Sequence, residues 1–196
     1  MAGITALQDL RDKGNIQPGQ KVVINGASGG VGTFAVQIAK AFGAEVTAVC
    51  STRNLDMVRS IGADHVIDYT REDFTRNGQR YDLILAANGY HPISDYLRAL
   101  SPEGIYVVAG GSMLQLFQAT RQGRKTSKTA MQKTYVVSLV QNQKDLVFVK
   151  GLLESGKVVP VIDGCYPLSK TAEALWYFEK EHTHGKVVIT VEPDGR

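Results

Sequence analysis

The chain has 196 residues, of which 43% are hydrophobic and 21% are charged, and its formal net charge is +3. This balance suits a globular chain with one large core or two small ones, and it excludes a disordered or collagen-like chain. Every apolar run is shorter than the roughly 20 residues that a membrane span needs. Two cysteines, Cys50 and Cys165, are too few for a disulfide framework, so we expect a soluble protein of the cytoplasm.

The first 50 residues predict a helix followed by a strand–turn–helix–strand unit. Residues 3–13 have apolar positions at helical spacing, and Lys21–Asn25 is a short β-branched run typical of a strand. Glycine-rich residues 26–32 follow, then an amphipathic helix over Val31–Phe42 and a second strand at Glu45–Cys50. Such a unit is the start of a parallel α/β fold.

The alternation continues to the end of the chain. Further strands are predicted at His65–Tyr69, Tyr81–Leu85, Ile105–Ala109, Tyr135–Val140, Val158–Ile162 and Lys186–Val191. Further helices are predicted at Asn54–Ile61, Pro92–Leu100, Met113–Thr120, Lys144–Glu154 and Ser169–Glu179. Strands that alternate with helices indicate a doubly wound parallel sheet with both faces covered, the three-layer α/β/α Rossmann arrangement. We expect one such domain over residues 1–196.

The glycine-rich turn, GASGGVG at residues 26–32, lies where a dinucleotide fingerprint belongs. Glycines allow a tight turn and a close approach of the backbone to a pyrophosphate, which faces the positive end of the following helix. In the G-x-G-x-x-G pattern, Ala27 replaces the first glycine, while Gly29 and Gly32 keep the other two. The alternative is a turn whose glycines only let the helix pack closely against the strand.

The end of the second strand indicates which dinucleotide would bind. An NAD site has an acidic residue about 20 residues after the fingerprint, whereas an NADP site has a cation and small donors. Ser51 and Arg53 stand there, with no acid between Cys50 and Asn54. A guanidinium is well shaped for a phosphate, so the sequence favours NADP(H). The alternative is an ordinary polar turn that caps the helix beginning near Asn54.

Residues 121–133 form a basic segment without an acid. Its five cations are Arg121, Arg124, Lys125, Lys128 and Lys133. A basic stripe can attract nucleic acid, but one on a loop of this composition is more often only solvated, so nucleic-acid binding is the minor reading. The apolar run Tyr135–Val140 that follows predicts an edge strand, which would pair with its copy in a homodimer.

The sequence offers no catalytic or metal-binding constellation. His182 and His184 lack a third ligand at metal-site spacing, and the two cysteines are far apart in the sequence. Neither a nucleophile elbow nor a Cys/His pair is present. We therefore assign no catalytic residue and no metal.

Several segments together resemble the medium-chain dehydrogenase/reductase superfamily, in its zinc-independent branch of quinone oxidoreductases. They are GITAL (3–7), the block PGQKVVINGASGGVGTFAVQIAKAFGAEV (18–46), GADHVIDYTREDF (62–74), GIYVVAGG (104–111), GKVVPVIDGCYPLS (156–169) and HGKVVITV (184–191). The resemblance implies an alcohol-dehydrogenase-like oxidoreductase that passes hydride from NADPH to a small quinone or α,β-unsaturated carbonyl compound. The nicotinamide cofactor itself would carry the hydride.

The resemblance also implies roles for matched positions. The pyrophosphate would be held at Ala27, Ser28, Gly29, Gly30, Val31 and Gly32. Ser51 and Arg53 would meet the 2′-phosphate, with Tyr69 beside the adenosine ribose. The nicotinamide half would lie near Asn88, Gly110 and Gly111, with Thr5 as a weaker candidate. Lys186 would supply a further phosphate contact, since His184 stands where many relatives have arginine.

Members of this superfamily also carry an N-terminal GroES-like domain, which forms one wall of the substrate cleft. The chain begins where their nucleotide-binding domain begins, so we expect it to lack that catalytic domain and to be inactive or weakly active alone. The alternative is a non-catalytic dinucleotide sensor, or a nucleic-acid-binding protein that uses residues 121–133.

Overall fold

The computed structural model describes residues 1–88, 90–110, 132–136, 140, 142–180 and 183–191. Its α-helices are α1 (Ala2–Gln8), α2 (Gly32–Ala41), α3 (Leu55–Ser60), α4 (Ile93–Ala99), α6 (Gln143–Glu154) and α7 (Thr171–Lys180). Its strands are β1 (Lys21–Asn25), β2 (Glu45–Cys50), β3 (His65–Asp68), β4 (Tyr81–Ala86), β5 (Leu100–Val108), β6 (Lys133–Val136), β7 (Ile162–Pro167) and β8 (Lys186–Thr190). Within the described ranges, no helix has the length and apolar character needed to cross a bilayer.

Six parallel strands form the central sheet, in the order β3-β2-β1-β4-β5-β6. The chain winds outward from β1 to β3 and then, from β4, in the opposite direction, so the order reverses between β1 and β4. Asn25, at the end of β1, is in register with Val49 of β2 and Ala86 of β4. The carboxyl ends of the three strands therefore meet at the switch point, where doubly wound folds bind ligands.

Helices cover both faces of this sheet, as a three-layer α/β/α Rossmann fold requires. On one face, α1, α2 and α3 pack on alternate strand residues such as Val22 and Ile24. On the other face, α4 and Phe74 pack on Val23 and the remaining set of strand residues. β1, β2 and β4 are buried on both faces, which explains their nearly continuous apolar sequence. The predicted fold class is confirmed.

The first helix differs in detail from its prediction. The helical pattern over residues 3–13 divides into α1 and a π-helical turn at Asp9–Lys13. Asp9 lies in this turn with no exposed surface. A carboxylate is thus placed in the core, between apolar residues that the helical spacing does predict.

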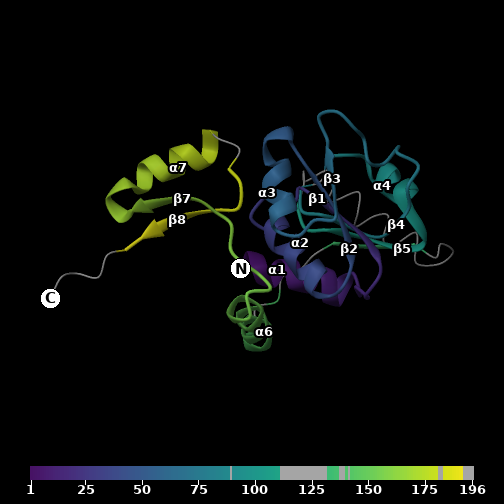
Figure 1. The fold of residues 1–196 in the computed structure, drawn as a ribbon, viewed down its shortest axis with the longest axis horizontal. Helices are drawn as coiled ribbons and strands as arrows, with labels where there is room; N and C mark the ends of the chain where they lie inside the picture. Colours follow the sequence, from purple (N-terminus) through teal and green to yellow (C-terminus); the bar gives the residue numbers. More distant parts are fainter. Residues whose placement is uncertain (89, 111–131, 137–139, 141, 181–182, 192–196) are drawn as a thin grey trace.

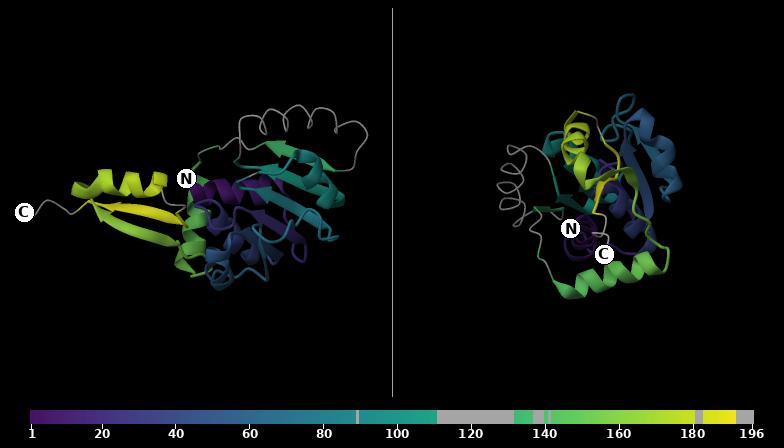
Figure 2. Two further views of the ribbon diagram at one scale, coloured as in Figure 1. Left: turned by 90° about the horizontal axis from the view of Figure 1, so that it is seen from above. Right: turned by 90° about the vertical axis from the view of Figure 1, so that its left-hand side faces the viewer.

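The C-terminal strands do not join the central sheet. β7 and β8 pair with each other in a separate parallel two-stranded sheet, and with α7 they project beyond one end of the central sheet (Figures 1 and 2). The strand predicted at Val158–Ile162 was wrong in position, since β7 begins only at Ile162. Val158 instead is buried against the main core, and the backbone of Val159 is held by a side chain of α2.

Some predicted elements fall on parts of the chain that the structure does not describe. These are the helix at 113–120, nearly all of the basic segment 121–133, and residues 137–139 of the strand at 135–140. Within the described ranges, β6 is one of the two edge strands of the sheet, with β3 at the other edge, and it pairs with β5 alone.

Candidate functional site

A cavity of about 560 Å³ opens at the switch point of the sheet. Its lining comes from the ends of β1, β2, β3 and β4 and from the C-terminal end of α7. The lining residues are Asn25, Gly26, Ser28, Gly29, Cys50, Ser51, Arg53, Asn54, Tyr69, Asn88, Tyr90, Phe178, Glu179 and Thr183. Six of the residues predicted to bind the cofactor are among them: Ser28, Gly29, Ser51, Arg53, Tyr69 and Asn88.

The glycine turn forms the floor of this cavity. The amides of Gly26 and Ala27 both donate to the carbonyl of Val49 on β2, which ties the turn to the neighbouring strand. Gly26 has a φ of +86°, a conformation that favours glycine. A Cβ added to Gly32 would lie 2.1 Å from the Gly26 oxygen, so α2 begins in direct contact with the turn. The close-packing role of these glycines is therefore present, and the helix starts directly from the turn, with the amide of Thr33 donating to the carbonyl of Gly29 at 2.9 Å.

Lys186 lies over the same turn. A Cβ added to Gly30 would lie 2.2 Å from the Nζ atom of Lys186, and the amide of Gly185 donates to the carbonyl of Ser28 at 2.8 Å. Among the described residues, no carboxylate is within ion-pair distance of this ammonium group. A lysine and a helix N-terminus thus converge on one point, and both favour an anion there.

The turn after β2 is organised by an acid that the sequence reasoning missed. The hydroxyl of Thr52 donates to the carboxylate of Asp68, at the end of β3, and so does that of Thr70. These hydrogen bonds, with the Thr52 bond contributing most, hold the pKa of Asp68 below its usual range, so the carboxylate is ionised at neutral pH. Asn54 also donates to the hydroxyl of Ser51, at 3.2 Å. Hydrogen bonds on both sides therefore shape the Ser51–Arg53 turn.

Four lining residues come from segments that the sequence did not connect with the site. Tyr90 follows β4, and its ring lies 5.5 Å from that of Tyr69, tilted by 52°. Phe178, Glu179 and Thr183 come from the end of α7 and the segment after it. The apolar, amphipathic pattern of α7 predicts only packing, and no local signal predicts that its C-terminal end closes a cavity at the sheet.

The inner wall of the cavity is neutral and rigid. The side-chain amide nitrogen of Asn25 donates to the backbone carbonyl of Asn88 at 3.2 Å and to the Tyr96 hydroxyl at 2.8 Å. That hydroxyl in turn accepts the amide of Tyr90 at 3.2 Å. Burial raises the pKa of the Cys50 thiol to about 11, so it is uncharged at neutral pH. Asn25, Asn88 and Cys50 therefore add no charge to this side of the cavity, whose charged lining residues are Arg53 and Glu179.

The remaining predicted residues lie beside the cavity or away from it. Ala27, Gly30, Val31 and Gly32 belong to the turn and to the start of α2, behind the lining. Gly110 follows the end of β5, and its backbone amide donates to the carbonyl of Ala86 on β4 at 3.1 Å. Gly111 lies outside the described residues. The hydroxyl of Thr5 donates to the Met1 carbonyl within α1, and Thr5 is not part of the lining. The binding roles of all these residues stay predictions.

Across the described residues, no group of three or more His, Cys, Asp or Glu side chains is arranged to hold a metal ion. His184, for example, pairs with Asp163 at 2.9 Å, and the same carboxylate accepts a hydrogen bond from Tyr177 at 3.1 Å. Asp163 thus orients His184 on the projecting C-terminal unit.

Comparison with known proteins places this arrangement in a family. Residues 61–189 match the family model described as zinc-binding dehydrogenase. The chain is 34% identical to a chloroplast envelope quinone oxidoreductase homolog of Arabidopsis thaliana, covering 96% of the chain and 59% of that protein. It is 37% identical to a mitochondrial NAD(P)H oxidoreductase of Bos taurus, covering 88% of the chain and 48% of that protein.

A solved structure gives the same result. The quinone oxidoreductase from Coxiella burnetii superposes with a TM-score of 0.83 at 25% identity, over 98% of this chain and 59% of that one. The chain thus spans about half to three-fifths of the length of these relatives. The chain belongs to the zinc-binding dehydrogenase family, within the medium-chain dehydrogenase/reductase superfamily.

Proposed function

We propose that this chain binds NADP(H) and presents the nicotinamide for hydride transfer to a quinone or an α,β-unsaturated carbonyl compound. The observation that carries the proposal is the convergence of Lys186 and the N-terminus of α2 on the glycine turn. A lysine ammonium group and the positive end of a helix dipole at one point suit a pyrophosphate. The adjoining cavity extends past Ser51 and Arg53, where a 2′-phosphate would lie in NADP(H).

The chemistry divides between cofactor and protein. When bound, the nicotinamide supplies the hydride. The residues of the chain hold the dinucleotide: the turn from Ser28 to Gly32 and Lys186 at the pyrophosphate, Ser51 and Arg53 at the 2′-phosphate, and Asn88 at the nicotinamide half. The substrate class follows the names of relatives, among them a chloroplastic NADPH-dependent alkenal/one oxidoreductase of Arabidopsis thaliana, 32% identical over 96% of this chain and 46% of that protein.

The preference for NADP(H) has one opposing feature. Glu179 lines the cavity together with Arg53, and Asp68 lies behind the turn, so the site is less uniformly positive than the sequence of the turn alone indicates. We still favour NADP(H), because the carboxylate of Asp68 accepts hydrogen bonds from two threonine hydroxyls and does not line the cavity. A guanidinium and a serine hydroxyl then remain as the groups of the turn that suit a phosphate.

The direct test is calorimetric titration of the 196-residue chain with NADPH and, separately, with NADH. We expect NADPH to bind much more tightly. Arg53→Glu should weaken NADPH binding by roughly tenfold or more and spare NADH, since only NADPH has the 2′-phosphate. Arg98→Glu makes the same charge change on α4, where Arg98 pairs with Asp95, and serves as the control. Equal losses for both nucleotides would contradict the role of Arg53.

Other features of the proposal concern the chain as a whole. We propose one dinucleotide-binding domain over residues 1–196, with weak or no turnover on its own. A homodimer through the strand predicted at Tyr135–Val140 and a cytoplasmic location are part of the same proposal. Both cysteines are free thiols, which suits a reducing compartment.

Two non-catalytic functions are the alternatives: a dinucleotide sensor and a nucleic-acid-binding protein. The second would depend on residues 121–133, nearly all of which lie outside the described part of the chain. Loss of a salt-sensitive nucleic-acid complex on changing Lys125 and Lys128 to Gln would favour it.

A further inference from the structure

Gln37 is a buried glutamine on α2, only 5% exposed, and its side chain is fully hydrogen-bonded. Its Nε2 donates to the carbonyl of Val159 at 2.9 Å, and the amide of Val159 donates back to Oε1 at 2.7 Å. Nε2 also donates to the carbonyl of Thr33 at 3.0 Å, within the helix. A side-chain amide thus pairs with a backbone amide, as one strand pairs with another, across 122 residues of sequence.

The segment held by Gln37 leads directly to Lys186. Two residues after Val159, the carbonyl of Val161 accepts the amide of Lys186 at 2.9 Å. A Cβ added to Gly185 would lie 2.2 Å from the Val161 oxygen, so the two backbones are in close contact there. The backbone at Lys186 is therefore held at two points, by Val161 and by the hydrogen bond from Gly185 to Ser28, and Val161 follows Val159, which pairs with Gln37.

The same helix carries both ends of this connection. The N-terminus of α2 follows the glycine turn, and Gln37 lies one turn further along the helix from Thr33. A shift of Val159 relative to α2 would move Lys186 relative to Gly30, over which its ammonium group lies. A lysine side chain is long and flexible, so a fixed backbone origin is what limits where its charge can be.

From these contacts we propose that Gln37 is a positioning residue for the phosphate site: it holds Val159, and through Val161 it places Lys186 over the glycine turn. The inference rests on the proposed function, since it assigns to Gln37 the placement of a cation that binds the pyrophosphate. Gln37 itself does not line the cavity and would not touch the cofactor.

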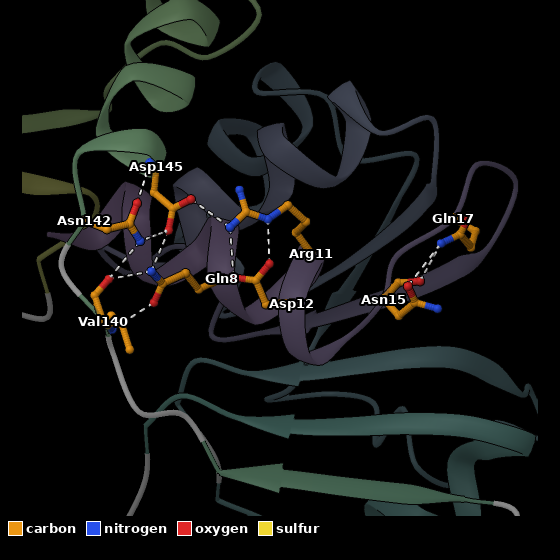
Figure 3. A network of polar contacts seen from close by, with 8 residues as sticks. All are labelled: Gln8, Arg11, Asp12, Asn15, Gln17, Val140, Asn142 and Asp145. Atoms are coloured by element: carbon orange, nitrogen blue, oxygen red, sulfur yellow. Dashed lines mark hydrogen bonds and ion pairs between the residues drawn. The ribbon is translucent and has the colours of Figure 1, made fainter.

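The chain provides a matched control in Gln8 of α1. Its Nε2 donates to the Val140 carbonyl at 2.6 Å, and the Val140 amide donates back to Oε1 at 3.0 Å (Figure 3). Gln8 is 6% exposed, and its Nε2 also donates to the buried Asp145. The two glutamines thus make the same pairing at opposite ends of the segment that contains α6, but only Gln37 is connected with Lys186.

The experiment compares Gln37→Met, Gln8→Met, Lys186→Met and the Gln37→Met/Lys186→Met double variant, by calorimetric titration with NADPH. Removing a hydrogen bond to a charged group weakens binding by about tenfold or more, and we expect about tenfold for Lys186→Met and up to that for Gln37→Met. In the Lys186→Met background, Gln37→Met should add less than about twofold, because its effect acts through Lys186. Gln8→Met should stay within about twofold of the unchanged chain.

A second ligand separates positioning from a general loosening of the fold. Adenosine 2′-monophosphate has the 2′-phosphate but no pyrophosphate, so Gln37→Met should leave its affinity unchanged. If Gln37→Met fails to fold, Gln37→Asn replaces it, since Asn is neutral and polar like Gln but one methylene shorter, so its amide is withdrawn from Val159.

Each other outcome overturns the inference. An equal loss from Gln37→Met with and without Lys186, an equal loss from Gln8→Met, or no loss at all would show that Gln37 does not position the lysine. Failure of the unchanged, folded chain to bind either dinucleotide would instead overturn the proposed function itself, and the inference with it.

Discussion

The most unusual group in the core is the carboxyl of Asp9, and its titration can be predicted. Asp9 has no exposed surface, and within the described part of the chain neither of its oxygens has a hydrogen-bond partner. Burial raises the pKa of Asp9 from 3.8 to about 7, against the smaller opposing effect of Lys13. Since the folded chain holds this proton more tightly than the unfolded chain, the free energy of unfolding should fall as the pH rises between about 4 and 7.

The size of this effect follows from the pKa shift. A shift of about three units corresponds to about 4 kcal/mol, lost at about 1.4 kcal/mol per pH unit across that interval. Below pH 4 the carboxyl is protonated in both states, and above pH 7 it is ionised in both, so Asp9 contributes no further slope. Asp9→Asn removes the titration, although the buried amide keeps its own constant cost of about 1–3 kcal/mol.

Urea unfolding followed by far-UV circular dichroism, at pH values from 4 to 8, measures this difference. The stability of Asp9→Asn relative to the unchanged chain should rise by about 4 kcal/mol across the series. Asp56→Asn is the control, because the Asp56 side chain is fully exposed, and its curve should run parallel to that of the unchanged chain. Parallel curves for Asp9→Asn, within about 0.5 kcal/mol, would refute the placement of an unpaired carboxyl in the core.

Two further predictions concern packing and a buried ion pair. Gly32→Ala should abolish dinucleotide binding and destabilise the chain, because the new Cβ would lie 2.1 Å from the Gly26 oxygen. The control is Gly151→Ala in α6, whose new Cβ meets nothing within 4 Å and should stabilise the chain by about 0.5–1 kcal/mol. Titration with NADPH and thermal melting check both; a stable, binding Gly32→Ala chain would contradict the packing. Asp145→Ala should lower the free energy of unfolding in urea by about 2–3 kcal/mol, since the Asp145 carboxylate is 3% exposed and accepts hydrogen bonds from three side chains. The control, Arg59→Ala, breaks only the exposed pair with Asp56 and should lower it by less than about 0.5 kcal/mol. Equal costs would be the contradicting result.

Local sequence patterns predicted the structure well where the contacting residues are close together in the sequence. The run from Lys21 to Cys50 folds as its apolar periodicity and glycines indicate, because strand, turn, helix and strand each bury the face that the pattern marks. The parallel direction of the strands was predictable from the alternation of strands and helices, because parallel neighbouring strands require crossover connections. The glycine turn, Ser51 and Arg53 were predictable because they follow strands whose carboxyl ends share one edge, whereas Tyr69 was assigned from the family resemblance.

Tertiary contacts decided what no local pattern carries. The C-terminal end of α7 supplies Phe178 and Glu179 to the cavity, although its sequence indicates only an amphipathic helix. The strand expected at Val158–Ile162 begins at Ile162, because Val159 pairs with Gln37 instead of with a neighbouring strand.

The sequence by itself determined the fold class and the glycine turn, because periodicity and glycine act over a few residues. It did not determine the burial of Asp9, the position of Lys186 over Gly30 or the link from Gln37 to Val159. Each of these is a contact or a burial whose energy depends on groups far away in the chain. Only the folded structure brings such groups within hydrogen-bonding distance or removes them from water.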